Sequence, residues 1–220
     1  MSKLRFFIIT FTANLLVIGG LTILGMTYIP IITSEVWYQL KTYKKQEYSL
    51  NPQNGQNSSV FARYLSKAPV SIYPVNKDFS IVIEKIDVNA PIVANVSVSN
   101  EDSYNDALKE GVAHAVGTAL PGENGNVYLF AHSSVNFFQL GKYATTFNLL
   151  RKLTMDDKVH LFYKGKDYTY QVIGKEVVEG WDLTHLTKTT LEPVLTLQTC
   201  DPPGTTFNRL VVTARLLSVN

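Results

Sequence analysis

The chain has 220 residues, of which 45% are hydrophobic and 17% charged, a composition typical of a globular protein with an unusually apolar segment. The formal net charge of +2 is unevenly distributed. Residues 1–79 carry eight Lys or Arg and three Asp or Glu, a net charge of +5, whereas residues 80–220 carry a net charge of −3. Because the C-terminal body has no excess of positive charge, the sequence argues against nucleic acid as a partner.

The number of cysteines excludes two further kinds of site. Cys200 is the single cysteine, so an intramolecular disulfide is excluded. One cysteine and four histidines also lack the paired ligand spacing of a zinc site.

The N-terminal segment predicts a membrane anchor. Residues 6–32 contain no charged residue, and as a helix they would span roughly 40 Å, enough to cross a bilayer with some tilt. A secretory signal peptide has an apolar region of about 7–15 residues and a small-residue cleavage site, and no Ala-x-Ala follows here. We therefore expect a cytoplasmic N-terminus at residues 1–5 and an uncleaved transmembrane signal anchor at residues 6–32.

The residues that follow the anchor are compatible with two arrangements. Trp37, Tyr38 and Tyr43 suit an aromatic belt at the membrane interface, but an amphipathic continuation of the same helix would carry the same residues. Lysine or arginine residues stand on both sides of the apolar segment, so the positive-inside rule does not decide the orientation.

Residues 33–79 are expected to form a stalk and a lead-in to the body. The stretch Asn51–Ser59 is polar, uncharged and rich in turn-forming residues, which indicates a linker. Pro69 and Pro74 interrupt any long helix after it.

Residues 80–220 predict a mostly-β domain. The runs rich in Val, Ile, Tyr and Phe are Ser80–Ile86, Ile92–Val98, Asn126–Ala131, Lys158–Tyr163, Asp167–Val178, Val194–Thr199 and Arg209–Ser218. Two short helical stretches interrupt them, near Ser103–Glu110 and Thr145–Leu153. Seven or eight short strands with few helices favour a closed or nearly closed β-barrel.

The residues best suited to chemistry stand at the ends of predicted strands. Cys200 ends the run 194–199 and opens the loop Asp201–Gly204, whose two prolines cannot continue the strand. Arg209 begins the next strand, so an antiparallel neighbour would place its guanidinium beside the thiol. His132 closes the run Asn126–Ala131 in the same way.

These residues resemble the sortase family. The run Thr196-Leu197-Gln198-Thr199-Cys200 is similar to the family signature Thr-Leu-x-Thr-Cys, and Arg209 stands where that family keeps its arginine. The stretch Gly111–Val127 followed by His132 is similar to the lead-in to the catalytic histidine. The resemblance covers residues 80–218. It implies a closed eight-stranded sortase-like barrel at residues 80–220, on the extracellular side of a single-pass cell-membrane protein.

The sequence also departs from the family pattern. Ala131 stands where a glycine commonly precedes the histidine, and Ser133 stands where arginine or threonine is frequent. No Asp-Pro-aromatic lid motif of the pilin-polymerising type occurs before residue 80. We therefore assign no sortase class.

The resemblance implies a cysteine transpeptidase. Cys200 would attack the Thr–Gly carbonyl of a Leu-Pro-x-Thr-Gly-like sorting signal and form a thioester acyl-enzyme. His132 would protonate the leaving amine and later deprotonate the incoming amine, while Arg209 would bind the oxyanion or the substrate backbone. Thr199 is a weaker candidate for the oxyanion pocket. The physical argument for a reactive cysteine is independent of the resemblance. A free thiol has a pKa of about 8.5, and adjacent cations favour the thiolate.

The implied partners are surface proteins that carry the sorting signal and an amine nucleophile, such as a cell-wall peptide or a lysine. No cofactor is expected, because the thioester conserves the energy of the amide bond. Some sortases bind calcium, but the acidic pairs Glu101-Asp102 and Asp156-Asp157 match no calcium loop.

The other histidines are weaker candidates. His114, in a loop flanked by glycines, is a competing base but fits a structural or surface role better. His160 is expected on the exposed face of its strand. His185 lies in the connection before the Cys200 strand, where a solvated loop is favoured over substrate binding.

Two other functions stay open at this stage. A membrane-anchored, non-catalytic β-barrel that binds peptides would show Cys200 as an inert thiol. Another peptidoglycan enzyme with a Cys–His pair is disfavoured, because the Ser-His-Gly-Cys motif of L,D-transpeptidases is absent and papain-like enzymes place the cysteine before the histidine. We also hypothesise that residues 33–79, with Phe61, Tyr64 and Tyr73, pack near the substrate groove and modulate access.

Overall fold

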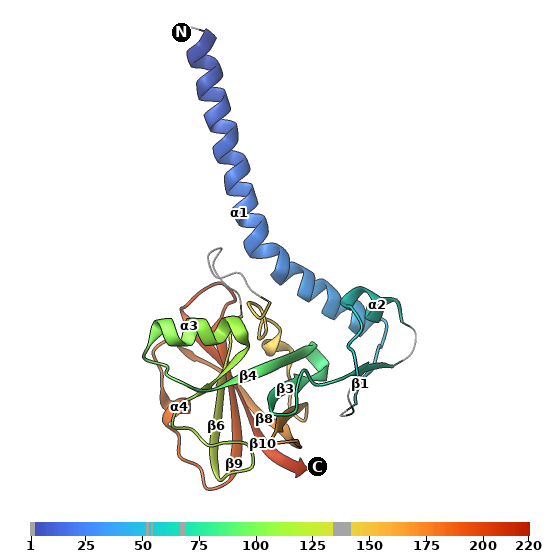
Figure 1. The fold of residues 1–220 in the computed structure, drawn as a ribbon. Coiled ribbons are helices and arrows are strands. Elements are labelled where there is room, and N and C mark those ends of the chain that lie inside the picture. Colours follow the sequence, from blue (N-terminus) through green and yellow to red (C-terminus); the bar gives the residue numbers. More distant parts are fainter. Residues whose placement is uncertain (1–2, 52, 54, 67–68, 134–141) are drawn as a thin grey trace.

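A closed β-barrel with a long N-terminal helix forms the architecture of the protein (Figure 1). The structure, a computed structural model, describes residues 3–51, 53, 55–66, 69–133 and 142–220. Helix α1 (Lys3–Tyr43) projects away from the barrel at its N-terminal end and lies against it at its C-terminal end (Figure 1).

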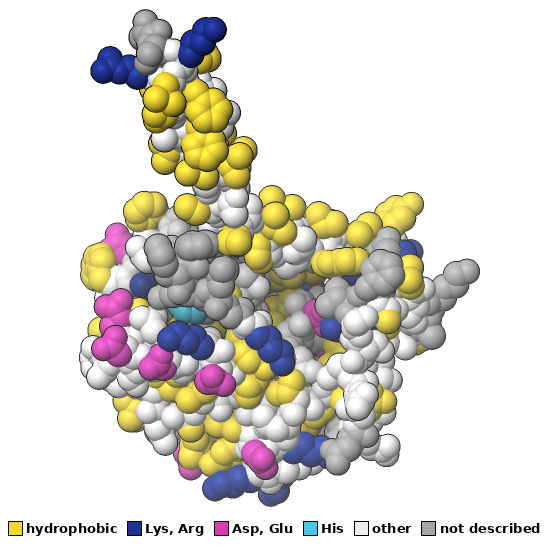
Figure 2. Space-filling view, turned by 45° about the horizontal axis from the view of Figure 1, so that its top comes forward, with side chains coloured by type: hydrophobic (Ala, Val, Ile, Leu, Met, Phe, Trp, Pro, Cys, Tyr) yellow, Lys and Arg dark blue, Asp and Glu magenta, His cyan; other side chains and the backbone are white. Residues whose placement is uncertain are grey.

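Helix α1 is longer than the apolar segment that begins it. Its 41 residues would extend roughly 60 Å at about 1.5 Å per residue. Within the described residues it is the one helix long and apolar enough to cross a membrane, and none of its residues is buried. Apolar side chains cover its projecting part, with Lys and Arg at its N-terminal tip (Figure 2).

The helix does not stop at residue 32 but continues to Tyr43. Tyr38 packs against the barrel core, whereas the Tyr43 side chain is 87% exposed. The helix therefore continues through these aromatic residues. Packing of Tyr38 against the barrel stabilises this part of the helix.

A small unit joins α1 to the barrel. Strands β1 (Tyr48–Leu50) and β2 (Val70–Ile72) pair in parallel, and helix α2 (Val60–Leu65) lies between them in the chain. Ile72 is buried with Val82 and Phe162 of the barrel. Three-residue strands show no periodicity, so the sequence analysis did not predict them.

Eight strands close the barrel in the order β10-β8-β7-β3-β4-β5-β6-β9, which confirms the predicted fold class. Their bounds are β3 (Phe79–Ile83), β4 (Val88–Val96), β5 (Val112–Ala115), β6 (Gly125–Phe130), β7 (Lys158–Tyr163), β8 (Lys166–Glu179), β9 (Pro193–Asp201) and β10 (Asn208–Val219). Apolar side chains of these strands fill the interior.

The prediction was wrong about several elements. Strand β5 was missed, since its four buried residues form too short a run between Gly111 and a turn. The first predicted strand ends at Ile83, where a 3₁₀ turn η1 (Glu84–Ile86) begins. The helix predicted at Thr145–Leu153 is a series of turns that ends in the 3₁₀ helix η3 (Leu150–Lys152).

Two helices lie over the barrel. Helix α3 (Glu101–Glu110) begins where the Asn100 side chain accepts a hydrogen bond from the Ser103 amide at 2.9 Å, a side-chain cap of the first turn. Its buried residues Ala107 and Leu108 pack on the core. The short helix α4 (Thr184–Thr187) lies in the β8–β9 connection.

Candidate active site

A pocket of about 480 Å³ lies where several connections meet at one end of the barrel. Its walls come from α3, the end of β6, the β8–β9 connection, the end of β9 and the β9–β10 loop. The four residues that the sequence singled out, His132, Thr199, Cys200 and Arg209, all line this pocket.

Strand pairing explains why the imidazole and the thiol reach the same end of the barrel. Strands β6 and β9 run parallel, and their last paired residues are Phe130 and Gln198. The C-terminal ends of parallel neighbours lie at the same edge of a sheet. His132 and Cys200 each follow that pair by two residues, so both lie just beyond the part of the sheet where β6 and β9 pair.

Strand β10, the other neighbour of β9, carries the Arg209 guanidinium. In the antiparallel β9–β10 pair, Arg209 is directly opposite Cys200, which places the two side chains on the same face. The Arg209 Nη1 donates hydrogen bonds of 3.1 Å to the carbonyls of Thr206 and Asn208. These bonds hold the arginine against its own loop.

Burial and charge act on the thiol in opposite directions. Burial raises the pKa of the Cys200 thiol, and the Arg209 charge lowers it in part. Burial also lowers the pKa of the His132 imidazole. Burial in the pocket therefore favours the neutral thiol and the neutral imidazole, and the Arg209 charge favours the thiolate.

Hydrogen bonds fix the chain around both groups. The His132 carbonyl accepts from the Phe147 amide at 3.0 Å, and the Ala131 amide donates to the Gln198 carbonyl at 3.2 Å. The buried Thr199 hydroxyl donates to the Ala131 carbonyl at 2.8 Å. Thr199 thus ties the residue before His132 to the residue before Cys200, and its hydroxyl hydrogen is used there.

The aromatic wall of the pocket was not predicted from the sequence. Tyr104 of α3 and Phe130 of β6 make an edge-to-face contact with ring centroids 6.4 Å apart. The Tyr128 hydroxyl donates to the Gln198 side chain, and burial raises its pKa. The helical pattern of α3 was visible in the sequence, but nothing in that pattern indicated which end of the barrel the helix would cover.

The remaining histidines lie elsewhere, and two predictions about them were wrong. His114 lies in strand β5 rather than a loop and is fully buried; its Nδ1 accepts from the Asn95 amide, which leaves Nε2–H to donate to the Ala119 carbonyl at 3.0 Å. His160 is buried, not exposed, with Nδ1 3.1 Å from the Asp167 carboxylate. His185 in α4 contacts Glu176 at 3.2 Å.

The acidic pairs do not gather into a site. In the part of the chain that the structure describes, no group of three or more His, Cys, Asp or Glu side chains is placed to hold a metal ion. Glu101 and Asp102 begin α3, and Asp157 pairs with Lys85 at 2.7 Å.

The stalk does not form a wall of this pocket. None of the described residues between 33 and 79 lines it. The Tyr73 carbonyl accepts hydrogen bonds from the side chains of Asn57 and Asn89, and the side chains of Phe61 and Tyr64 lie outside the described residues.

A closed barrel that brings a thiol, an imidazole and a guanidinium into one pocket has the architecture and side-chain set of a cysteine transpeptidase. Comparison with known proteins agrees with this class. The sortase domain family matches residues 81–217. The chain therefore belongs to the sortase family.

Individual relatives support the same assignment. Sortase D of Bacillus subtilis (strain 168) is 27% identical over 139 residues, which make up 62% of this chain and 62% of that protein, so the match spans less than two thirds of its length. The crystal structure of sortase C from Clostridium perfringens SM101 is 30% identical, with a TM-score of 0.51, over 66% of this chain and 73% of that one. Sortase C-1 of Actinomyces oris is 26% identical, with a TM-score of 0.55, over 86% of this chain and 99% of that one.

Proposed function

We propose that this protein is a membrane-anchored transpeptidase that cleaves a Leu-Pro-x-Thr-Gly-like sorting signal and joins the released acyl group to an amine. The observation that carries the proposal is the strand register. It sets Cys200 opposite Arg209 and brings His132 to the same pocket.

Acylation begins with the thiolate. Transfer of the Cys200 proton to His132 gives a thiolate and an imidazolium, and the Arg209 charge favours the thiolate. The sulfur attacks the carbonyl carbon of the Thr–Gly bond and forms a tetrahedral oxyanion, to which Arg209 donates hydrogen bonds. When the C–N bond breaks, the imidazolium gives its proton to the leaving amine, and a thioester remains on Cys200.

Deacylation reverses the proton flow. His132, now neutral, takes a proton from the incoming amine as the nitrogen attacks the thioester carbonyl. The C–S bond breaks, the thiolate is regenerated and a new amide is formed. The low pKa that burial gives the imidazole suits this second step, because it keeps His132 in the form that accepts a proton.

The lining of the pocket suits a signal that begins with apolar residues. Leu108, Leu183 and Leu186 provide apolar surface beside Cys200, and Tyr104 and Phe130 add an aromatic wall. Burial of the Leu and Pro side chains of the signal against this surface would provide binding free energy. The polar backbone of the signal would then face Cys200 and Arg209.

The apolar part of α1 supports a location at the cell membrane. Residues 6–32 of α1 would span the cell membrane, residues 33–79 would form the stalk and lead-in, and residues 80–220 the catalytic barrel on the extracellular side. The substrates would be surface proteins that carry the signal, and the acceptor a cell-wall peptide or a lysine.

The test is to trap the acyl-enzyme. The full-length protein in detergent is incubated with a small library of Leu-Pro-x-Thr-Gly-like peptides, and its intact mass is measured with and without an added amine. We expect an adduct on Cys200, no adduct on Cys200→Ala, and a ligated product when the amine is present. A thiol that neither forms an adduct nor reacts with a methanethiosulfonate reagent would contradict the proposal and favour a non-catalytic binding barrel.

A further inference from the structure

The stalk end of α1 makes specific polar contacts with the segment that follows the candidate base. The Ser34 hydroxyl accepts a hydrogen bond from the side-chain Nδ2 of Asn148, and the Glu35 carboxylate pairs with Lys152 Nζ at 2.6 Å. The same Nζ lies 5.2 Å from the centre of the Tyr38 ring. Asn148 and Lys152 belong to residues 143–153, which we call the bridge segment.

The bridge segment also contacts the active site. The Phe147 amide donates to the His132 carbonyl at 3.0 Å, and Arg151 Nη2 lies 2.9 Å from the carboxylate of Asp201, the residue after Cys200. One short segment therefore touches α1 on one side, and the neighbours of the base and of the nucleophile on the other.

The bridge segment is packed firmly into the barrel. Phe147, Leu150 and Leu153 are fully buried in the barrel core, and Lys175 Nζ donates to the carbonyls of Arg151 and Leu153 at 2.7 Å. Close-packed interiors deform little, so a shift at Asn148 or Lys152 moves the segment as a unit. Backbone amides along the segment also bond the carbonyl three residues earlier, as Asn148 does to Thr145 and Lys152 to Leu149, so the segment is braced internally.

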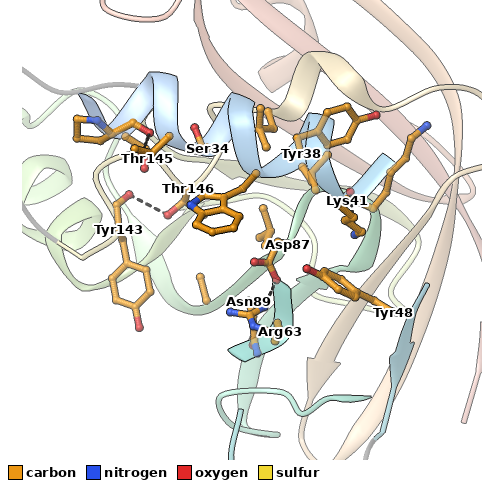
Figure 3. Close-up of a pocket in the computed structure, with 18 of the residues that line it drawn as sticks. Ser34, Tyr38, Lys41, Tyr48, Arg63, Asp87, Asn89, Tyr143, Thr145 and Thr146 are labelled. Atoms are coloured by element: carbon orange, nitrogen blue, oxygen red, sulfur yellow. Dashed lines mark hydrogen bonds and ion pairs between the residues drawn. The ribbon is translucent and has the colours of Figure 1, made fainter. Parts of the chain in front are cut away.

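The packing between α1 and the bridge segment is incomplete, so polar contacts supply much of the interaction between the two elements. A cavity of about 560 Å³ lies between them, bounded by Ser34 and Tyr38 on α1 and by Tyr143, Thr145 and Thr146 on the bridge segment (Figure 3). The Ser34–Asn148 and Glu35–Lys152 contacts join α1 directly to the bridge segment, whereas Tyr38 packs on the core and Lys41 Nζ donates to the Lys85 carbonyl at 3.2 Å.

We propose that Ser34 and Glu35 of the anchor helix are positioning residues for the active site, acting on His132 and on the loop after Cys200 through the bridge segment. The inference rests on the proposed transpeptidase function for its catalytic consequence, but not for the structural coupling. The helix that holds the protein in the membrane would thus also hold its catalytic groups in register.

The test uses the full-length protein in detergent micelles and two readouts. Hydrogen–deuterium exchange of the Phe147 amide reports the coupling without any substrate, and peptide transfer kinetics report its consequence. For Glu35→Gln combined with Ser34→Ala we expect exchange at Phe147 to rise about threefold and kcat to fall about threefold, the range of a partly exposed ion pair, with KM unchanged. The charge-reversed pair Glu35→Lys with Lys152→Glu should restore both.

A matched control is available on the same helix. Thr42 is exposed and its hydroxyl bonds only the Tyr38 carbonyl within α1, so Thr42→Ala should leave both readouts unchanged. Unchanged Phe147 exchange in the Ser34/Glu35 variant would overturn the inference, as would an equal rise in exchange throughout the barrel. A wild type that exchanges as expected but transfers no peptide would instead refute the proposed function.

Discussion

Cys200 and Arg209 face each other across the β9–β10 pair, and the pKa of the thiol depends on the balance between them. Burial raises that pKa and the guanidinium lowers it. A thiol with a raised pKa is protonated at neutral pH, so its reactivity increases as the pH rises through the pKa. The arginine opposes the effect of burial and increases the thiolate fraction at any given pH.

Replacing Arg209 tests this balance directly. In Arg209→Gln the favourable charge is lost, the pKa of Cys200 rises further, and alkylation at pH 7.5 should slow by about three- to tenfold, since a shift of one pKa unit is a tenfold change in thiolate. The pH profile of the alkylation rate measures it. Arg215→Gln, on the same strand opposite Val194, is the control and should match the wild type. A profile that does not move in Arg209→Gln would contradict the prediction.

Thr199 acts on the site through the backbone. Its hydroxyl bonds the Ala131 carbonyl, so Thr199→Val leaves that buried acceptor without its partner and loosens the connection to His132. We expect kcat to fall about fivefold and stability to fall by about 1–2 kcal/mol, with Thr199→Ser, which keeps the hydroxyl, near wild type. Peptide transfer kinetics and denaturant unfolding measure the two effects. A loss of kcat in Thr199→Val without any loss of stability, restored in Thr199→Ser, would instead support the oxyanion role inferred from the family resemblance.

At the level of elements, predictability followed the length and periodicity of the strands. The long strands β7, β8, β9 and β10 were predicted nearly residue for residue, because alternation over six or more residues is a strong signal. Strand β5 and the bridge segment were not, since a four-residue buried run and a series of turns are determined by the packing around them. The end of β9, at Asp201, was predicted to within two residues because two prolines follow it.

The junction between α3 and β5 offers a sharp test of that packing. A Cβ added at Gly111 would lie 2.2 Å from the Pro91 carbonyl oxygen, a backbone atom that cannot rotate away. Gly111→Ala should therefore destabilise the barrel by about 2–3 kcal/mol. Gly174→Ala in β8, where nothing lies within 4 Å, should stay within about 0.5 kcal/mol of wild type by the same denaturant unfolding. Equal effects of the two substitutions would contradict the packing argument.

For the molecule as a whole, the open question is on which side of the membrane the barrel lies. Lys or Arg residues flank the apolar segment on both sides, so charge alone predicts no orientation. The orientation proposed above puts the barrel on the extracellular side and residues 1–5 in the cytoplasm.

Labelling of single cysteines measures the orientation. In a Cys200→Ala background, Leu191→Cys places a thiol on a side chain that is 88% exposed, and Lys3→Cys places one at the other end of α1. A membrane-impermeant maleimide added to intact cells should label position 191 at once and position 3 only after permeabilisation. The reverse pattern would refute an extracellular barrel.

The sequence by itself determined the long apolar N-terminal segment, the mostly-β body and the position of His132, Cys200 and Arg209 near strand ends, because hydropathy, alternation and proline act locally along the chain. Only the tertiary structure decided the parallel β6–β9 pairing that brings His132 level with Cys200, the burial of His114 and His160, and the contact of α1 with the bridge segment. These depend on which strands become neighbours when the barrel closes. Closure joins residues far apart in the chain, and no local pattern encodes it.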